Sequence, residues 1–274
     1  MNTTVLNIAH RGARSLAPEN TLLAAQKAFD IGADMWELDC GMLADGEIII
    51  MHDDTFKRTT NITEIFPGRE ANHLSTFTWQ EVSQLEAGSF YMKTDPFEQI
   101  KAGNVNESEL AEFSTVRIPT LREALQFTKD RNWRVNVEIK NMKGTPGDSK
   151  IVGGVIRLIQ EMNMQANVLI SSFNHTYLAQ CQAINPTIQT ATLLGMQKPG
   201  DLKKTMKLGC SAYHPPVYAL TIAHIKRARK LGLNVNIWTV NEKAKMLSLI
   251  EAGATGIITD FPQIMAEIKN NRVQ

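Results

Sequence analysis

Two histidines of the sequence stand directly after short apolar runs. His10 follows residues 5–9, and His52 follows residues 47–51. An imidazole can accept or donate a proton near neutral pH, so two histidines held together could act as general base and general acid. This chemistry requires that the fold bring the two side chains to one place.

Three carboxylates lie at the ends of two other strand-like runs. Glu37 and Asp39 are two residues apart, and so are Glu138 and Lys140. Alternate residues of a strand point to the same face, so each pair presents its side chains together. Carboxylates gathered at one place repel each other unless a cation lies between them. Glu37, Asp39 and Glu138 therefore predict an all-oxygen site for a hard divalent ion, Ca²⁺ or Mg²⁺.

A second interpretation of these carboxylates stays open. Each could pair with Arg11 or Lys140 in a structural network without a metal. The same two cations, beside a metal ion, would also suit an anionic phosphoryl centre. The sequence has no P-loop and no GxGxxG motif, so a glycine-rich nucleotide cradle is not expected. The remaining histidines do not stand beside the carboxylates and are predicted to be structural: His73, His175, His214 and His224.

The elements that must position these residues alternate between strand and helix patterns. Strand-like runs cover residues 5–9, 35–39, 47–51, 134–139, 167–171, 188–194, 210–214, 233–239 and 256–259. Amphipathic segments lie between most of them, including one at 21–31, one that starts with a Thr120 and Glu123 capping box, and one at 242–251. Repeated strand–helix units predict a parallel sheet covered by helices.

Nine strand candidates are one more than an eight-stranded barrel holds. The run at 47–51 follows the run at 35–39 too closely for a helical crossover. Because Asp45-Gly46 is a strong hairpin signal, we predict a β-hairpin over residues 36–52 with an antiparallel second arm. A turn centred on this dipeptide places Asp39 opposite His52, and a bulge or longer loop shifts that pairing by a residue or two. Eight parallel strands remain, which predicts a TIM-type (β/α)8 barrel with its active site at the carboxyl ends of the strands.

Residues 54–118 break the alternating rhythm and show little periodicity. A long irregular segment inside a compact domain is usually a functional insertion. We predict a single barrel domain over residues 1–274, with 54–118 as a small inserted subdomain over one end of the barrel. A disordered excursion is the alternative, and the aromatic residues of the segment favour packing instead: Phe66, Phe77, Trp79, Phe90, Tyr91 and Phe97.

The composition excludes several classes of protein. Lysine plus arginine number 29 and aspartate plus glutamate 28, a net charge of +1 over 274 residues, so a strongly basic nucleic-acid binder is not expected. No apolar run approaches the ~18 residues of a membrane span, so no integral membrane association is expected. Three scattered cysteines and the lack of a signal-peptide pattern at residues 1–7 predict a cytoplasmic protein. A periplasmic or secreted location stays open if a signal peptide has been removed.

The motifs taken together resemble the glycerophosphodiester phosphodiesterase family over residues 7–262. A single short motif would be weak, but this set in this order is highly specific. The matching segments are Ala9-His10-Arg11-Gly12, Pro18-Glu19-Asn20-Thr21, Glu37-Leu38-Asp39, His52-Asp53, Arg58-Thr59-Thr60, Val137-Glu138-Ile139-Lys140, Ser171-Ser172-Phe173, Trp238-Thr239-Val240-Asn241 and Gly256-Ile257-Ile258-Thr259-Asp260.

The resemblance implies a TIM-type barrel that hydrolyses small-molecule glycerophosphodiesters to an alcohol and glycerol 3-phosphate with a divalent metal. It implies the roles of eight residues: metal ligation by Glu37, Asp39 and Glu138, acid–base catalysis by His10 and His52, phosphate contact by Arg11 and Lys140, and a glycerol-side wall formed by Trp238. The role of Glu19 stays open between support of the site from behind and a favourable charge at a helix N-terminus. A homo-oligomer also stays open.

Two other functions remain as alternatives. One is a lysophospholipase D-type or other phosphodiesterase, in which the insert admits a longer tail. The other is a non-catalytic barrel that binds phosphodiesters. Such a barrel should have lost a histidine or a ligand, and here every expected position is filled.

Overall fold

A computed structural model describes residues 5–273 of the chain. The prediction that the chain lacks a signal-peptide pattern used residues 1–7. Residues 1–4 of that segment lie outside the described range. None of the helices in the described part of the chain is long and apolar enough to cross a membrane.

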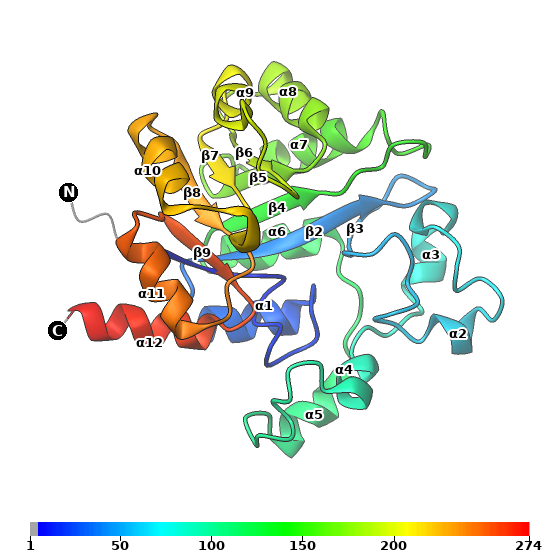
Figure 1. The fold of residues 1–274 in the computed structure, drawn as a ribbon. Coiled ribbons are helices and arrows are strands. Elements are labelled where there is room, and N and C mark those ends of the chain that lie inside the picture. Colours follow the sequence, from blue (N-terminus) through cyan, green and yellow to red (C-terminus); the bar gives the residue numbers. More distant parts are fainter. Residues whose placement is uncertain (1–4, 274) are drawn as a thin grey trace.

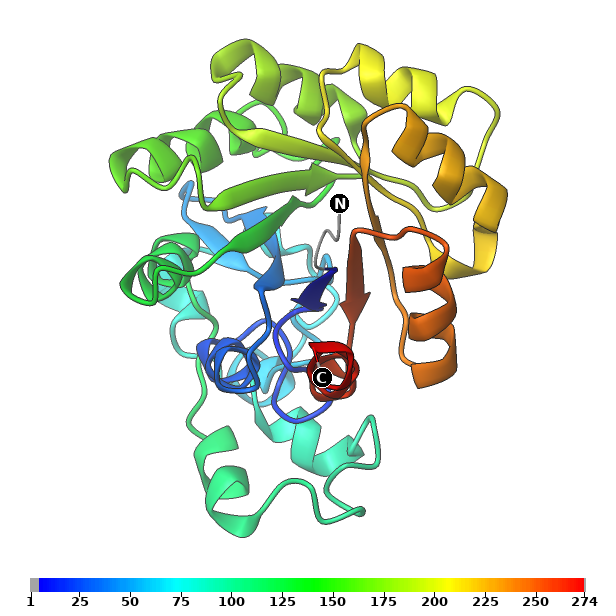
Figure 2. The ribbon, with the colours of Figure 1, turned by 90° about the vertical axis from the view of Figure 1, so that its left-hand side faces the viewer.

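Eight parallel strands close into a ring, which confirms the predicted TIM-type barrel. β1 pairs with both β2 and β9, and this double pairing closes the barrel. Figure 2 shows the strands around a central axis with the helices outside them. The strands are β1 (Leu6–Ala9), β2 (Met35–Met42), β4 (Val135–Ile139), β5 (Val168–Ser172), β6 (Gln189–Leu193), β7 (Ala212–His214), β8 (Asn234–Ile237) and β9 (Gly256–Thr259).

The helices form the outer layer of the barrel (Figure 1). They are α1 (Leu22–Asp30), α6 (Leu121–Asp130), α7 (Ile151–Glu161), α8 (His175–Ile184), α9 (Asp201–Lys207), α10 (Ile222–Lys230), α11 (Lys243–Glu251) and α12 (Pro262–Val273). Thr21 caps α1, and its hydroxyl oxygen accepts a hydrogen bond from the N–H of Ala24 over 3.1 Å. The predicted capping box of Thr120 and Glu123 starts α6.

The predicted hairpin is present, but its register differs by one residue. β3 (Ile48–Ile50) runs antiparallel to β2 and pairs Cys40 with Ile50, so Asp39 lies opposite Met51 and not His52. The turn holds three residues, 44–46, because the N–H of Leu43 bonds to the carbonyl of Glu47 over 2.8 Å. Gly46 has a φ of +91°, the left-handed conformation that ends a three-residue hairpin loop.

The two faces of β2 serve different cores. Trp36 packs outward, stacked on Trp133 with ring centroids 6.3 Å apart in the layer between strands and helices. Met35 points into the barrel and packs with small and aliphatic side chains from the other strands: Ile8, Leu169, Ala191, Ala212 and Ile258. Glu37 and Asp39 share the face of Met35, so they continue the barrel interior toward the carboxyl end of the strand.

Residues 54–118 are folded and packed on the barrel. They form α2 (Ile62–Ile65), the 3₁₀ helix η1 (Leu74–Thr76), α3 (Trp79–Val82), α4 (Ser89–Thr94) and α5 (Glu107–Phe113). Phe77 is buried in the main core, and Tyr91 is buried against Ala17 and Ala24 near α1. The Tyr91 hydroxyl donates a hydrogen bond to the carbonyl of Ser15. The aromatic residues therefore pack as the sequence suggested.

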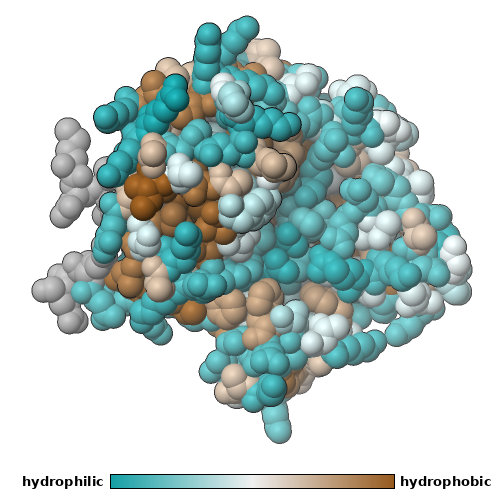
Figure 3. Space-filling view, viewed as in Figure 1, coloured by the Kyte–Doolittle hydropathy of each residue, from teal (hydrophilic) through white to brown (hydrophobic). Residues whose placement is uncertain are grey.

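The surface in the view of Figure 3 is mostly hydrophilic. Apolar side chains gather there over the region of α10, α11 and β9. Two of the exposed apolar residues lie on or beside α10, Ile222 and Leu231.

Candidate active site

A cavity of ≈ 180 Å³ lies at the carboxyl ends of the strands and collects the predicted residues. Six of the eight line it: His10, Arg11, Glu37, His52, Glu138 and Trp238. The other two, Asp39 and Lys140, do not line it, and an ion pair of 3.3 Å joins them to each other. Residues from strands far apart in the sequence thus meet at one site.

Each of the two histidines is held by an aspartate. His10 Nδ1 lies 2.7 Å from Asp260 Oδ1, and His52 Nδ1 lies 2.6 Å from Asp53 Oδ1. A carboxylate that accepts a hydrogen bond from Nδ1–H fixes the ring and leaves Nε2 for chemistry. Among residues 5–273 no protein group forms a hydrogen bond with either Nε2 atom. Burial, reinforced by the nearby Arg11, lowers the pKa of His10.

The three predicted ligand carboxylates form a buried cluster. One oxygen atom from each of Glu37, Asp39 and Glu138 lies within 4.8 Å of the others. Burial and the neighbouring Asp39 raise the pKa of both Glu37 and Glu138. Burial would also raise the pKa of Asp39, but Lys140 and Arg11 outweigh it and hold that pKa well below its usual range. Like charges therefore crowd this cluster.

Positively charged side chains of the protein pair with only some oxygens of this carboxylate cluster. Arg11 Nε lies 3.3 Å from Asp39, and Lys140 Nζ lies 3.0 Å from Glu138. Glu37 receives the backbone N–H of Arg11 over 2.9 Å, but no lysine or arginine side chain of the described residues pairs with it. Glu138 Oε1 is buried without a hydrogen bond of good geometry, even to the nearby Lys140. Unpaired carboxylate oxygens are the donors that Ca²⁺ and Mg²⁺ bind, so these residues fit such an ion.

The loop after β1 shapes the site through unusual backbone conformations. Arg11 and Gly12 have φ values of +55° and +81°. A Cβ atom on Gly12 would lie 2.6 Å from the backbone carbon of Ala24, so only glycine allows this approach to α1. Asn20 has a φ of +57° and forms two hydrogen bonds with Asp39. Asn20 Nδ2 donates to Asp39 Oδ2 over 2.9 Å, and the Asp39 N–H donates to Asn20 Oδ1 over 3.2 Å.

Several residues of the site carried no assigned role in the sequence. Asp260 and His10 are 250 positions apart, so no spacing rule connects them. Asn241 precedes α11, and its amide donates to Asp260 over 2.7 Å. Asp260 and Asn241 could have been found from the sequence through their place in the motif segments. The same holds for Asp53, Arg58 and Asn20.

Trp238 forms one wall of the cavity. Its indole N–H donates to the carbonyl of His214 over 2.9 Å, which fixes the ring. Phe173 packs edge-to-face against it with ring centroids 5.7 Å apart, and Leu193 lines the same cavity. This wall is apolar and lies among the polar groups of the site.

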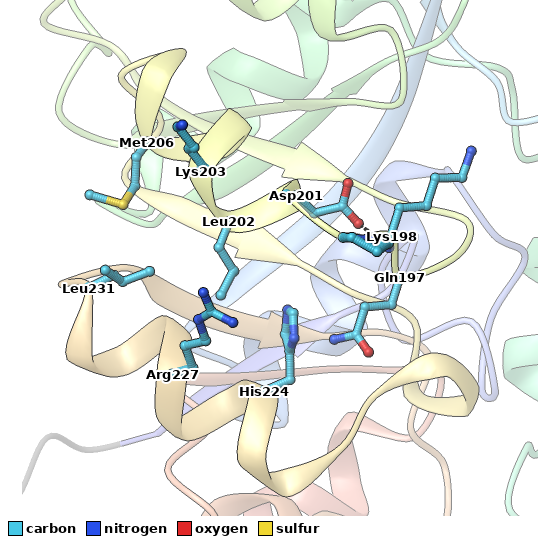
Figure 4. A pocket seen from close by; sticks show the side chains of 11 residues that line it. Gln197, Lys198, Asp201, Leu202, Lys203, Met206, His224, Arg227 and Leu231 are labelled. Atoms are coloured by element: carbon cyan, nitrogen blue, oxygen red, sulfur yellow. Dashed lines mark hydrogen bonds between the residues drawn. The ribbon is translucent and has the colours of Figure 1, made fainter.

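A larger hollow of ≈ 570 Å³ lies outside the barrel between α9 and α10. Figure 4 shows Lys198, Asp201, His224 and Arg227 around it. It contains none of the predicted site residues. The cavity at the strand ends is therefore the one that combines histidines with the carboxylate cluster.

The strand ends of this (β/α)8 barrel carry two histidine–aspartate pairs and a buried carboxylate cluster. These groups suit the hydrolysis of a phosphodiester. The model of the glycerophosphoryl diester phosphodiesterase family matches residues 10–264. The chain belongs to this family and is a phosphoric diester hydrolase.

Named relatives cover nearly the whole chain. A glycerophosphodiester phosphodiesterase of Caldanaerobacter subterraneus is 32% identical over 266 residues, covering 96% of this chain and 97% of the relative. Another from Bacillus subtilis is 28% identical over 276 residues, covering 97% of this chain and 86% of the relative. These matches extend over the full barrel and the insert.

Solved structures share the fold. An Oleispira antarctica phosphodiesterase, in complex with the product sn-glycerol-3-phosphate, has a TM-score of 0.81 at 24% identity over 96% of each chain. A glycerophosphodiester phosphodiesterase of Parabacteroides distasonis has a TM-score of 0.76 at 22% identity over 100% of each chain. At these identities the likeness concerns the fold.

Proposed function

We propose that the chain hydrolyses glycerophosphodiesters to an alcohol and glycerol 3-phosphate by metal-dependent acid–base catalysis. The observation that carries this proposal is that two histidines, each held by an aspartate, line one cavity together with Glu37 and Glu138 of the carboxylate cluster. The names of the relatives and the glycerol 3-phosphate bound to the Oleispira enzyme support the substrate class.

Glu37, Asp39 and Glu138 would hold the divalent cation, Ca²⁺ or Mg²⁺. When bound, such an ion supplies positive charge that neutralises phosphodiester oxygens. Arg11 and Lys140 add fixed positive charge beside the same cluster, where they contact the substrate phosphate. Trp238 and Phe173 form the apolar wall against which the carbon side of the glycerol packs.

The histidines carry the proton transfers. One Nε2 atom removes the proton from the attacking hydroxyl, and the other Nε2 protonates the departing alkoxide. Asp260 and Asp53 hold the rings through Nδ1 and stabilise the charged imidazolium in each step. The attacking group is the 2-hydroxyl of the substrate's own glycerol. Its oxygen bonds to phosphorus as the alcohol leaves, which gives a cyclic phosphate that water then opens.

The direct test is a metal-by-substrate screen. The purified protein is incubated with glycerophosphocholine and Ca²⁺ or Mg²⁺, and release of glycerol 3-phosphate is measured. Phosphorus NMR during turnover should show the cyclic phosphate, and a 2-deoxyglycerol substrate should not react. Turnover of the 2-deoxy substrate without a cyclic species would reject the internal nucleophile. Absence of hydrolysis with every metal and diester would reject the proposed function.

A lysophospholipase D-type activity is the second candidate. Phe173 is 43% exposed, and two further apolar side chains that follow β6 and β7 in the chain, Met196 and Tyr218, are 66% and 74% exposed. The Tyr218 hydroxyl donates to the carbonyl of Gly195 over 2.7 Å, which joins the loops that follow β6 and β7. This apolar rim could receive an acyl chain. A comparison of glycerophosphocholine with lysophosphatidylcholine as substrates decides between the two.

A further inference from the structure

One buried carboxylate near the cavity is bound by three arginines. Glu19 is buried in the loop between β1 and α1. Its oxygens lie 2.8 Å from Arg11 Nη1, 2.8 Å from Arg14 Nη2 and 2.7 Å from Arg58 Nη2. Burial opposes its ionisation, but the three guanidinium groups, Arg58 first among them, lower the pKa of Glu19 to about 2. The side chain is therefore a fixed negative charge.

One of these arginines, Arg58, connects Glu19 to His52 through contacts with Asp53. Arg58 Nε lies 2.7 Å from Asp53 Oδ2, and its Nη2 lies 2.9 Å from Asp53 Oδ1. Asp53 Oδ1 in turn holds His52 Nδ1 over 2.6 Å. Arg58 belongs to the segment 54–118, so the insert takes part in placing this histidine.

A second arginine, Arg14, connects Glu19 to His10 through a contact with Asp260. Arg14 Nη1 lies 3.5 Å from Asp260 Oδ1, the same oxygen that holds His10 Nδ1 over 2.7 Å. The insert also reaches this side, because the guanidinium of Arg14 lies 5.2 Å from the ring centroid of Phe97. The two histidine–aspartate pairs are thus the two ends of one chain of contacts whose centre is Glu19.

We propose that Glu19 is a positioning residue that sets the orientation and charge of both histidine–aspartate pairs through Arg14 and Arg58. The inference rests on the proposed function, because it assigns both histidines to the reaction. It also favours support of the site from behind as the role of Glu19, because three arginines bind its carboxylate.

The charges around the histidines give the direction of the expected effect. Asp260, Arg11 and Arg14 lie around His10, while Asp53 holds His52 and is itself bound by Arg58. Without the charge of Glu19, Arg14 and Arg58 interact only with the two aspartates and neutralise them more fully. Each histidine then loses part of its negative partner, so its charged form becomes less favourable.

The test is the pH profile of kcat/KM for Glu19→Gln with glycerophosphocholine and saturating metal. Loss of a group that orients another typically lowers activity about 10–100-fold, and we expect a fall of that size. We also expect both limbs of the profile to move to lower pH, which a merely structural role would not cause. Glu19→Asp keeps the charge and should restore the limbs. Limbs that stay in place in active Glu19→Gln protein would overturn the inference.

Two further variants separate the arms of the chain. Arg14→Gln removes positive charge beside Asp260, and Arg58→Gln removes it beside Asp53, so each should move a different limb, and toward higher pH. If Glu19→Gln does not fold, these two variants test the inference instead. The inference is rejected if both variants move the same limb of the pH profile, or if neither variant moves a limb. NMR titration of the His10 and His52 imidazoles provides the same comparison without turnover.

A matched control is available elsewhere in the insert. Glu86 is also buried, and its Oε2 accepts the N–H groups of Gly88 and Ser89 over 2.9 and 2.8 Å, away from both histidines. Glu86→Gln should leave both limbs in place even if it lowers stability, and movement of the limbs in this variant would reject the inference as nonspecific. Retained turnover in His10→Ala or His52→Ala rejects the acid–base roles assigned to the histidines under the proposed function. Loss of turnover there, with unmoved limbs in Glu19→Gln, rejects only the present inference.

Discussion

The backbone N–H of Arg11 donates to Glu37 Oε2 over 2.9 Å, while the side chain of the same arginine lies 3.3 Å from Asp39. The residue proposed to contact phosphate thereby also fixes two of the carboxylates proposed to hold a cation. The left-handed backbone at Arg11 is what turns its N–H and its guanidinium toward the same cluster. The proposed phosphate contact and the proposed metal site therefore share the contacts of one residue.

Replacing Arg11 by lysine should separate these two roles. The backbone N–H to Glu37 remains, but a lysine cannot reproduce the planar guanidinium that meets Glu19 and Asp39 together. We expect kcat/KM to fall by about tenfold or more, with Ca²⁺ affinity nearly unchanged in titration calorimetry. Equal losses in both quantities would contradict the separation.

Alanine at His10 or His52 should remove the acid–base chemistry. General acid–base catalysis contributes about 10²–10⁴-fold, so kcat should fall by that factor at saturating metal. His224→Ala is the control, because His224 bonds to Tyr213 on the far side of the barrel wall and lies outside the cavity. Either site variant with near-normal turnover would show that the acid–base assignment is wrong.

Chelation should abolish activity, and Ca²⁺ or Mg²⁺ should restore it. Because burial and Asp39 raise the pKa of Glu37 and Glu138, cation binding should also release protons. The release is measured as a fall in pH when metal is added to the chelated protein in weak buffer. Glu138→Gln should reduce both effects. Full activity in excess chelator would exclude the carboxylate metal site.

The buried His214 should make stability depend on pH. Burial lowers the pKa of His214 to about 3, whereas an unfolded histidine has a pKa near 6.5. The unfolded chain therefore binds the extra proton, and this contribution is present above pH 6.5 and is lost as pH falls toward 3. The free energy of unfolding should decrease by roughly 1.4 kcal/mol per pH unit from this group.

His214→Gln provides the comparison for that slope. Its side-chain oxygen can replace Nε2 as the acceptor for Asn236, which donates over 3.0 Å, but it does not titrate. Urea unfolding of both proteins at pH 7 and pH 5 should show a shallower pH dependence in the variant. Parallel slopes would mean that His214 is already protonated in the folded protein or accessible to water.

Alanine at Gly12 should be far more damaging than alanine at Gly46. Both glycines have positive φ, but a Cβ at Gly12 meets the backbone of Ala24 at 2.6 Å, whereas nothing lies within 4 Å of one at Gly46. We expect about 1 kcal/mol of destabilisation at Gly46 from the left-handed conformation, and roughly 3 kcal/mol or more at Gly12. Thermal and urea unfolding measure both, and equal effects would mean that the Gly12 loop rearranges.

Most strands and helices of the barrel, and the side chains at the strand ends, were predictable from the sequence. Alternating apolar runs indicated the strands, Asp45-Gly46 indicated the hairpin, and the two-residue spacing of Glu37 and Asp39 put both carboxylates on one face. These are local properties, because strand periodicity and turn preference depend on neighbouring residues. The family motifs then identified which strand ends carry the site.

The contacts between side chains of different elements became visible only in the folded barrel. The hairpin register depended on a three-residue turn, and this placed Asp39 opposite Met51. His10 found Asp260 only because β1 pairs with β9 when the barrel closes. Arg58 reached Glu19 only because the insert folds back onto the loop after β1. Each contact joins side chains far apart in the chain, and their distance is fixed by the packing of whole elements, which no local pattern encodes.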